Sequence, residues 1–332
     1  MSAPAQSMYS PAAIEVASRL GLMMGKANLE AFADALLALA KEDQDVLAVT
    51  SDSRGSGKLG PFGQALPEQI VELGIAEQNL VGVAAGLASC GKTVYAVSPA
   101  CFLTARALEQ IKNDVAYSDN PVNVIGISAG VSYGALGSTH HSLHDFAALR
   151  AINNIDVVAP ADNAETRAVI AIAARRQKPT YIRFGKAPLY DLVGGGTPFE
   201  IGKACTIRDG ADVCFIATGE TVIHALLAAE SLAESGLSCR VISMHTVKPP
   251  DAGAILRAGR ECGAVITVEE HSVHGGLGEA CAALLMQAGA RVRMKIVGIP
   301  DEYTVTGSQA DIFRHYGISM EGVSQTAMSL LK

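Results

Sequence analysis

One glutamate stands between an apolar segment and a helix of small residues, where its carboxylate could take part in acid–base or hydrogen-bonding chemistry. The segment Val71–Ile75 is typical of the end of a buried strand, and the run LVGVAAGLASC from Leu80 to Cys90 predicts a closely packed helix. Glu77 then falls in the first turn of that helix, partly enclosed. Acidic residues are common at helix N-termini because they complement the helix dipole, so position alone favours a structural role.

Three histidines lie in the glycine-rich segment YGALGSTHHSLHD, which follows a predicted strand ending at Ser128. Ligands of doubly wound sheets collect at the carboxyl ends of strands, so His140, His141 and His144 are candidates for a pocket. Their spacing matches no recognised zinc pattern. A metal site and an ordinary polar loop are both compatible with the residues, and the residues alone favour the ordinary loop.

Two further candidates follow predicted strands. Phe102 lies in SPACFLTAR, and an aromatic residue beside a strand end is most often part of the core. Asp52 lies in VTSDS, where an aspartate commonly forms a turn or a helix cap after a strand. Residue type alone therefore gives both a structural explanation.

The elements that would position these residues alternate along the first half of the chain. A helical pattern from Leu29 to Ala40 precedes a short apolar strand at Val46–Val49. The other predicted strands are near residue 71 and at 93–97, 122–128, 155–159 and 180–184, and the other predicted helices are 76–90, 104–117 and 164–176. This alternation predicts a doubly wound α/β domain.

A glycine-rich run, GGGTP at 194–198, interrupts the periodicity and predicts a linker between two compact units. Beyond it, strands at 213–217, 240–243, 264–268 and 292–297 and helices at 221–235, 251–262 and 277–288 predict a second, smaller α/β domain. We therefore divide the chain into an N-terminal extension (1–24), a first α/β domain (25–190), a linker (191–199) and a second α/β domain (200–332).

Composition limits the classes of function. With 332 residues, 49% of them hydrophobic, the chain can bury the cores of two domains. A net charge of -7 argues against nucleic acid and anionic membranes as partners. The N-terminal residues lack the pattern of a signal peptide, no apolar run reaches transmembrane length, and the seven cysteines show no CxxC spacing. We expect a cytoplasmic protein with reduced cysteines.

In combination, these segments resemble the C-terminal half of a transketolase, a thiamine-diphosphate enzyme. The resemblance rests on ELGIAEQN around Glu77, GSTH ending at His140 and GIPD at 298–301, and it extends from about residue 25 to residue 328. It implies a pyrimidine-binding domain followed by a transketolase C-terminal domain, made here as a separate polypeptide. It also implies transfer of a two-carbon ketol unit from a ketose donor to an aldose acceptor.

The resemblance assigns roles to the candidate residues. Glu77 would hydrogen-bond a ring nitrogen of the cofactor's pyrimidine, Phe102 would stack on that ring, and Asp52 would lie near the cofactor. His140 would face the sugar and exchange protons with its oxygens, with His141 as a further substrate-facing candidate. The cofactor itself would carry out the carbon chemistry.

A partner chain follows from what the sequence lacks. The family holds the diphosphate and a divalent metal with a Gly-Asp-Gly segment and a distant Asn, and the sequence contains no Gly-Asp-Gly. We therefore expect no metal ligand in this chain and a partner that carries the diphosphate-binding domain with Mg²⁺ or Ca²⁺. The expected assembly is a heterotetramer of two plus two chains.

Four residues depart from the usual transketolase pattern. Gly25 and Ala159 stand where the family usually has arginines that grip the sugar phosphate. Leu136 stands where an acidic residue binds a sugar hydroxyl, and Ser128 replaces a further substrate-facing histidine. These positions suggest an altered substrate site.

The missing arginines matter because a bidentate guanidinium is the usual planar grip on phosphate. Our hypothesis is that the substrate is not a standard pentose-pathway sugar phosphate, or that its anion is bound elsewhere. Arg54, Lys58 and Lys186 are the candidates for that role, although each taken singly is typical of a solvated surface charge.

Two other assignments compete with this one. The β chain of a 2-oxo-acid dehydrogenase shares both domains, the glutamate and a loop histidine, but typically has Gln before that histidine, where this chain has Thr139. A non-catalytic partner chain is the second alternative. The presence of Glu77, Phe102 and His140 together argues against it.

Overall fold

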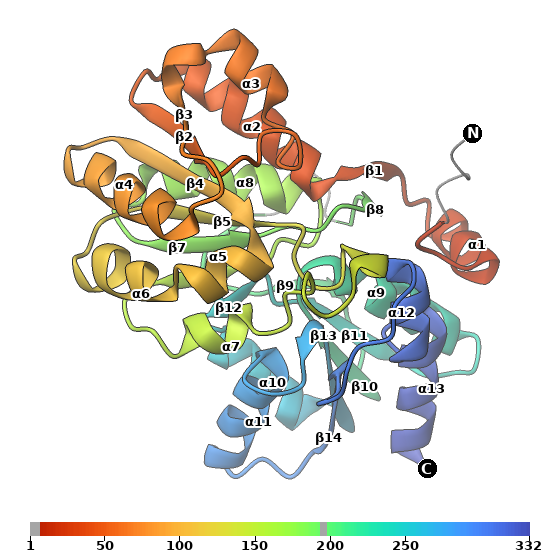
Figure 1. Ribbon diagram of the computed structural model, residues 1–332. Helices are drawn as coiled ribbons and strands as arrows, with labels where there is room; N and C mark the ends of the chain where they lie inside the picture. The colour runs from red at the N-terminus through yellow and green to blue at the C-terminus, as the bar shows by residue number, and fades with distance from the viewer. Residues whose placement is uncertain (1–6, 193–197) are drawn as a thin grey trace.

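The computed structural model describes residues 7–192 and 198–332. Five residues of the predicted linker, 193–197, and the first six residues of the predicted N-terminal extension lie outside the described part. The described chain contains two mixed sheets, each flanked by helices, so the predicted fold of two α/β domains is confirmed (Figure 1). No helix in the described residues has the length and apolar character needed to cross a membrane.

The first sheet has seven strands in the order β12-β6-β7-β5-β4-β2-β3. Six of them come from the first domain and run parallel: β2 (Val46–Thr50), β3 (Ile70–Glu72), β4 (Thr93–Pro99), β5 (Asn123–Ile127), β6 (Asp156–Val158) and β7 (Thr180–Arg183). The seventh, β12 (Thr246–Lys248), pairs antiparallel with β6 and comes from the second domain. No local sequence pattern indicates that a strand of the second domain joins the first sheet.

Helices cover both faces of this sheet because successive strand residues point to opposite sides. In β4, Tyr95 and Val97 pack with α2 (Asn28–Glu42), α3 (Gly60–Ala65) and α8 (Asn163–Arg175). Val94 and Ala96 pack on the other side with α4 (Glu77–Ser89), α5 (Ala100–Arg106) and α7 (Asp145–Arg150). A single-turn helix η1 (Pro67–Gln69) precedes β3, and another, η3 (Gly134–Leu136), follows β5.

The predicted helix 104–117 is wrong in its boundaries. The helix α5 begins at Ala100 and ends at Arg106, and Ala107 then departs from helical geometry. The short helix α6 (Leu108–Gln110) and the π-helical segment η2 (Ile111–Tyr117) follow. Apolar periodicity runs through the whole stretch, so no local signal marks this break.

The second sheet has five strands in the order β14-β13-β10-β11-β9, with β9 antiparallel. The strands are β9 (Cys205–Arg208), β10 (Val213–Ala217), β11 (Cys239–Ser243), β13 (Ala264–Ser272) and β14 (Arg293–Ile299). The short helix η4 (Gly219–Thr221) leads into α9 (Val222–Ala233), and the other helices are α10 (Ala252–Glu261), α11 (Leu277–Gln287), α12 (Gln309–His315) and α13 (Met320–Leu331).

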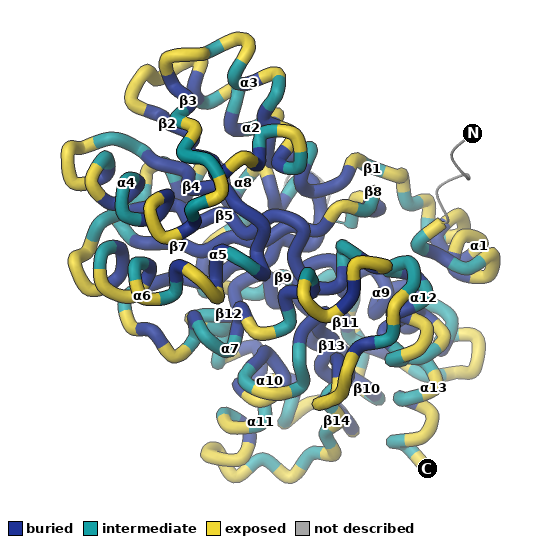
Figure 2. Tube along the Cα trace, in the orientation of Figure 1, coloured by how far each residue is buried: buried dark blue, intermediate teal, exposed yellow. Residues whose placement is uncertain are grey.

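One apolar core runs from the first domain into the second. It joins side chains of α4, α5 and α7 to Ile216, Ile242 and Val247, which belong to β10, β11 and β12. Figure 2 shows the resulting buried layer between the two sheets. The two domains are therefore packed against each other over a shared core.

The N-terminal residues from 7 onward also belong to the packed body. The helix α1 (Pro11–Arg19) begins at the capping residue Ser10 and packs with α9 in one apolar cluster. The Tyr9 ring lies 4.9 Å from Tyr190 and 5.5 Å from His224, measured between ring centroids. The short strands β1 (Met24–Ala27) and β8 (Pro188–Tyr190) then pair antiparallel.

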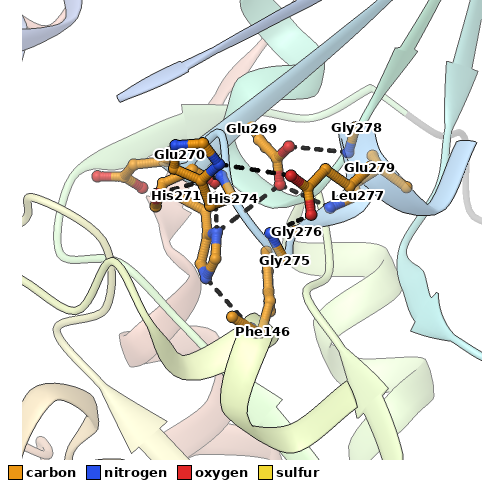
Figure 3. A network of polar contacts seen from close by, with 12 residues as sticks. Phe146, Glu269, Glu270, His271, His274, Gly275, Gly276, Leu277, Gly278 and Glu279 are labelled. Carbon is orange, nitrogen blue, oxygen red and sulfur yellow. Dashed lines mark hydrogen bonds and ion pairs between the residues drawn. The ribbon is translucent and has the colours of Figure 1, made fainter. Parts of the chain in front are cut away.

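The turn between β13 and α11 is fixed by buried polar contacts (Figure 3). Glu269 accepts hydrogen bonds from the backbone N–H groups of Leu277, at 2.7 Å, and Gly278, at 2.8 Å. His271 stacks on Phe146 of α7, with 5.0 Å between ring centroids. This turn therefore joins the second domain to the first.

A buried guanidinium lies at the centre of the domain interface. Arg183 of β7 donates to Asp145 at 2.9 and 3.1 Å and to the carbonyl oxygen of Glu270 at 2.8 Å. Burial raises the pKa of Glu220 to about 8 and that of Glu270 to about 7, and the two neighbouring carboxyls share the one cation. The buried Tyr9 also faces Glu220 from the N-terminal segment.

This interface predicts an alkaline loss of stability. The ordinary pKa of Glu220 is 4.5. Between about pH 4.5 and pH 8 the folded chain therefore keeps this carboxyl protonated, whereas the unfolded chain releases the proton. The contribution of Glu220 to the free energy of unfolding is therefore complete below about pH 4.5 and is lost as the pH rises toward 8. We expect Glu220→Gln to flatten the decline of melting temperature between pH 5 and pH 8.5. Glu68→Gln, at an exposed carboxyl, is the matched control, and parallel wild-type and E220Q curves would contradict the prediction.

Candidate active site

The candidate residues gather at the carboxyl edge of the first sheet. Glu77 follows β3, Phe102 follows β4, and His140 lies in the loop after β5. Because parallel strands end at the same edge of a sheet, three connections far apart in sequence meet there (Figure 1). The ends of β2 and β4 are tied by a 2.8 Å hydrogen bond from Ser51 Oγ to Ser98 Oγ.

Glu77 is the first residue of α4 and is only 4% exposed. It lies at a hollow of about 620 Å³ lined by residues 75–79 and Arg106. Arg106 Nη1 donates to Glu77 Oε1 at 2.8 Å. A buried carboxylate thus faces a space large enough for part of a small molecule.

Phe102 and Arg106 lie one turn apart on α5, so their side chains share a helix face. The guanidinium carbon of Arg106 lies 4.6 Å from the centroid of the Phe102 ring. The His140 ring also meets the Phe102 ring edge to face, with 5.3 Å between the two centroids. Phe102 therefore connects the glutamate to the histidine loop.

The contacts continue beyond His140. Its ring meets Tyr133 edge to face at 5.4 Å, and Lys186 Nζ lies 4.5 Å from the centroid of Tyr133. The ammonium group is consequently within about 10 Å of the imidazole. We name the whole chain of contacts the active-site row, and it consists of Glu77, Arg106, Phe102, His140, Tyr133 and Lys186.

Two groups in this row are available for a ligand. His140 Nδ1 lies 3.0 Å from Thr139 Oγ1, and its Nε2 has no hydrogen-bond partner in the part of the chain that the structure describes. Lys186 has no acidic partner within the described ranges, and burial lowers its pKa, with a smaller contribution from Lys58. The row thus offers one imidazole nitrogen and one exposed cation that has no acidic partner among the described residues.

His141 has a different place from its neighbour. Its Nδ1 lies 2.9 Å from Thr304 Oγ1, and its Nε2 lies 2.9 Å from the carbonyl oxygen of Gly134. Burial lowers its pKa. Both ring nitrogens are therefore engaged, one joining the loop to Thr304 of the second domain and the other closing the loop on its own Gly134, and His141 does not line the hollow.

The strand ends under the site carry unusual backbone angles. Asp52 after β2 has a φ of 53° and Ser128 after β5 has a φ of 52°, both in the left-handed region that non-glycine residues rarely adopt. Ser128 is fully buried, whereas Asp52 is exposed. Such strain is concentrated at functional sites, because the surrounding structure must impose it.

The remaining candidates do not join the row. Arg54 pairs with Glu72 at 3.4 Å, and the same carboxylate accepts from the Asp52 backbone at 2.6 Å. Lys58 pairs with Glu30 at 3.2 Å. Leu136 is 55% exposed at the tip of the loop.

The two positions without arginine differ in their surroundings. A Cβ on Gly25 would come within 2.8 Å of Asn163 Oδ1 and 2.9 Å of Asp191 Oδ1, so a longer side chain has no room there. Ala159 is buried at the domain interface, where its carbonyl oxygen accepts from the backbone N–H of Gly219. Neither position can supply the anion contact that an arginine would make.

Sequence patterns assign no role to Arg106, Tyr133 or Thr304. The spacing of Phe102 and Arg106 by four residues in a predicted helix was the available signal for the first. The contact of Thr304 with His141 joins residues 163 positions apart, which no local pattern indicates. Within the described ranges, no group of three or more His, Cys, Asp or Glu side chains is arranged to hold a metal ion.

Two family descriptions match this chain. "Transketolase, pyrimidine binding domain" matches residues 25–190, and "Transketolase, C-terminal domain" matches residues 202–323. Together they cover both sheets described above.

Curated relatives and solved structures agree with these matches. The chain is 48% identical to one of the chains of the apulose-4-phosphate transketolase of Phocaeicola vulgatus, over 91% of this chain and 97% of that protein. It is 35% identical to a chain of the 6-deoxy-6-sulfo-D-fructose transketolase of a Clostridium species, over 90% of this chain and 92% of that protein. A structure described as "Split gene transketolase, inactive beta4 tetramer" is similar with a TM-score of 0.83 and 34% identity, covering 92% of this chain and 98% of that one.

The contacts of His141 lead to a prediction on stability. We expect His141→Ala to lower the free energy of unfolding by roughly 1–3 kcal/mol, because it leaves buried polar groups of the loop without partners. Hydrogen exchange should also accelerate in residues 133–142. Replacement of the exposed His315 by Ala is the control. An H141A chain with wild-type stability and wild-type exchange in this loop would show that the contacts to Thr304 and Gly134 do not hold it.

Proposed function

The chain belongs to the transketolase family as the half of a split enzyme that carries the pyrimidine-binding and C-terminal domains, and we propose that, together with a partner chain, it transfers a two-carbon ketol unit from a ketose donor to an aldose acceptor. The observation that carries the proposal is the active-site row, which begins at a buried carboxylate and ends at a cation without an acidic partner among the described residues. One end suits a nitrogen heterocycle and the other suits an anion.

The residues present fit the pyrimidine half of thiamine diphosphate. Glu77 is buried at a hollow and presents a carboxylate to it, and the Phe102 ring lies one contact away, so one planar ring that is protonated at a ring nitrogen could donate to the carboxylate and stack on Phe102 together. The planar guanidinium of Arg106 now makes both contacts, so the space accepts a flat cationic group. When bound, the cofactor supplies the electron sink for cleavage and formation of the carbon–carbon bond.

The other half of the cofactor requires a partner. The sequence has no Gly-Asp-Gly segment for the diphosphate and its metal, and we propose that the partner chain supplies these ligands, with Mg²⁺ or Ca²⁺. The exposure of an apolar side chain at the hollow supports a protein cover there: Ile75, which lines the hollow with Glu77, is 74% exposed. We propose two copies of each chain in the assembly. The seven free cysteines support a cytoplasmic location.

His140 is the proposed proton carrier of this chain. Thr139 bonds its Nδ1, which orients the ring and leaves Nε2 available to a substrate oxygen. An imidazole suits this task because its ordinary pKa is close to neutral. The edge contacts with Phe102 and Tyr133 hold the ring between the glutamate and the lysine.

We propose that Lys186 binds the terminal anion of the sugar. Of the three candidate cations, Arg54 and Lys58 already have acidic partners, whereas Lys186 has none in the described part of the chain. Lys186 Nζ lies within about 10 Å of the His140 ring, so one short ligand could contact both groups. Since the chain is 48% identical to a chain of an apulose-4-phosphate transketolase, we propose apulose 4-phosphate as the donor.

Replacement of Glu77 tests the proposed function. We expect Glu77→Gln to lower kcat/KM of the complex by about 10²-fold or more, the lower range for loss of a group that directs proton transfer. The measurement is product formation from apulose 4-phosphate and an aldehyde acceptor, followed by mass spectrometry. Glu109→Gln, at an exposed carboxyl, is the control. If E77Q retained wild-type turnover, the chain would be a scaffold for its partner rather than half of an active site.

Replacement of Lys186 tests how the anion is bound. We expect Lys186→Ala to raise KM for the sugar phosphate about tenfold, corresponding to about 1.4 kcal/mol of lost binding, with little change in kcat. The unphosphorylated sugar should show no such change, and Lys58→Ala should leave both substrates unaffected. An equal effect on the charged and the uncharged sugar would assign the anion to another residue.

A further inference from the structure

We propose that Arg106 is a placeholder for the cofactor's pyrimidine ring: in the unloaded chain its guanidinium fills the seat of the ring, and it leaves when the cofactor binds. This inference rests on the proposed function, because it takes Glu77 and Phe102 as the pyrimidine seat. It assigns a task to Arg106, which belongs to neither the proposed ring-binding nor the proposed substrate-binding groups.

The two contacts of Arg106 carry the inference. Its Nη1 donates to Glu77 Oε1 at 2.8 Å, and its guanidinium carbon lies 4.6 Å from the centre of the Phe102 ring. A pyrimidine seated here binds the same carboxylate through its ring nitrogen, which becomes a donor by taking up a proton from solvent, and lays a flat face against the same Phe102 ring. Guanidinium is planar, carries fixed donors and stacks on aromatic rings, so it is the side-chain group best suited to imitate both contacts.

The side chains of Glu77 and Arg106 differ in how far they are exposed to solvent. The side chain of Glu77 is 5% exposed, whereas that of Arg106 is 52% exposed. Arg106 is the last residue of α5, and the backbone departs from helical geometry at the next residue, Ala107. Its guanidinium has no second acidic partner among the described residues. The arginine can therefore rotate toward solvent while the glutamate stays in place.

Electrostatics explains why a placeholder is useful. A buried carboxylate without a partner is unfavourable, since burial removes its hydration. Within the described ranges, Arg106 is the one cation paired with Glu77. The arginine stabilises Glu77 and Phe102 in place before the cofactor binds, and the incoming ring takes over its contact with the carboxylate and its stacking surface. The cost of displacing it lowers the affinity of the seat for the ring.

The test measures binding of the isolated chain to 4-amino-5-hydroxymethyl-2-methylpyrimidine, which represents the pyrimidine half of the cofactor. Isothermal titration calorimetry gives the affinity, and thermal unfolding gives the stability. We expect Arg106→Ala to bind the pyrimidine about tenfold more tightly than wild type, a factor that corresponds to about 1.4 kcal/mol. Without ligand, the same variant should melt at a lower temperature than wild type.

These opposite changes separate a placeholder from a structural residue. If Arg106 were only structural, the R106A variant would be less stable than wild type and would bind the pyrimidine equally well or more weakly. Weaker, unchanged or undetectable binding of the pyrimidine by R106A would therefore overturn the inference. Arg19→Ala is the matched control, because Arg19 is a partly exposed arginine that pairs with Glu234 away from the site. The double variant Glu77→Ala/Arg106→Ala should lose the gain in affinity.

The proposed function is tested separately. If the wild-type complex binds thiamine diphosphate and turns over but R106A gains no affinity for the pyrimidine, only the placeholder fails. If the wild-type complex does not bind thiamine diphosphate, the proposed function fails, whatever the behaviour of R106A.

Discussion

The guanidinium of Arg183 is the contact on which the arrangement of the two domains and the site depends. It comes from β7 of the first sheet and binds both Asp145 at the start of α7 and the backbone of Glu270 on β13. Glu270 in turn accepts from the backbone of Val131, where the histidine loop begins, and from Gln309 of α12. A charge buried this deeply is stable only with such partners, so one group fixes the domain interface and the start of the histidine loop together.

From that base, the fold sets the order of the site. Parallel strands bring their connections to one edge, and side chains that follow β3, β4, β5 and β7 form a continuous row from a carboxylate to an ammonium group. Only the middle of this row is packed on both sides. The carboxylate end opens on a hollow with an exposed Ile75, which is the character of a half-site completed by another protein surface. Geometry and comparisons thus agree on a split enzyme whose second half is a separate chain.

The contacts of Arg106 bear on how this half-site stays folded before it assembles with a partner. A chain that awaits both a partner and a cofactor must keep a buried acid and an aromatic ring in place without the ligand that they hold. Arg106 meets both needs through one planar cation, and its exposed position leaves it free to move. Pairing of this kind stabilises the glutamate and the aromatic ring before the ligand binds, at some cost in ligand affinity.

Much of this protein followed from its sequence. The alternation of strands and helices determined two α/β domains, and the position of Glu77 at a helix start followed from the small residues behind it. Residue patterns repeat at short range, so they report local structure well. Four features came only from the tertiary structure: the exchange of β12 between domains, the break after Arg106, the attachment of His141 to Thr304, and the choice of Lys186 over Arg54 and Lys58 as the cation without an acidic partner in the described ranges. The strand pairing, the histidine contact and the charge pairing depend on which segments and which charges meet in the folded chain, and no local spacing encodes this.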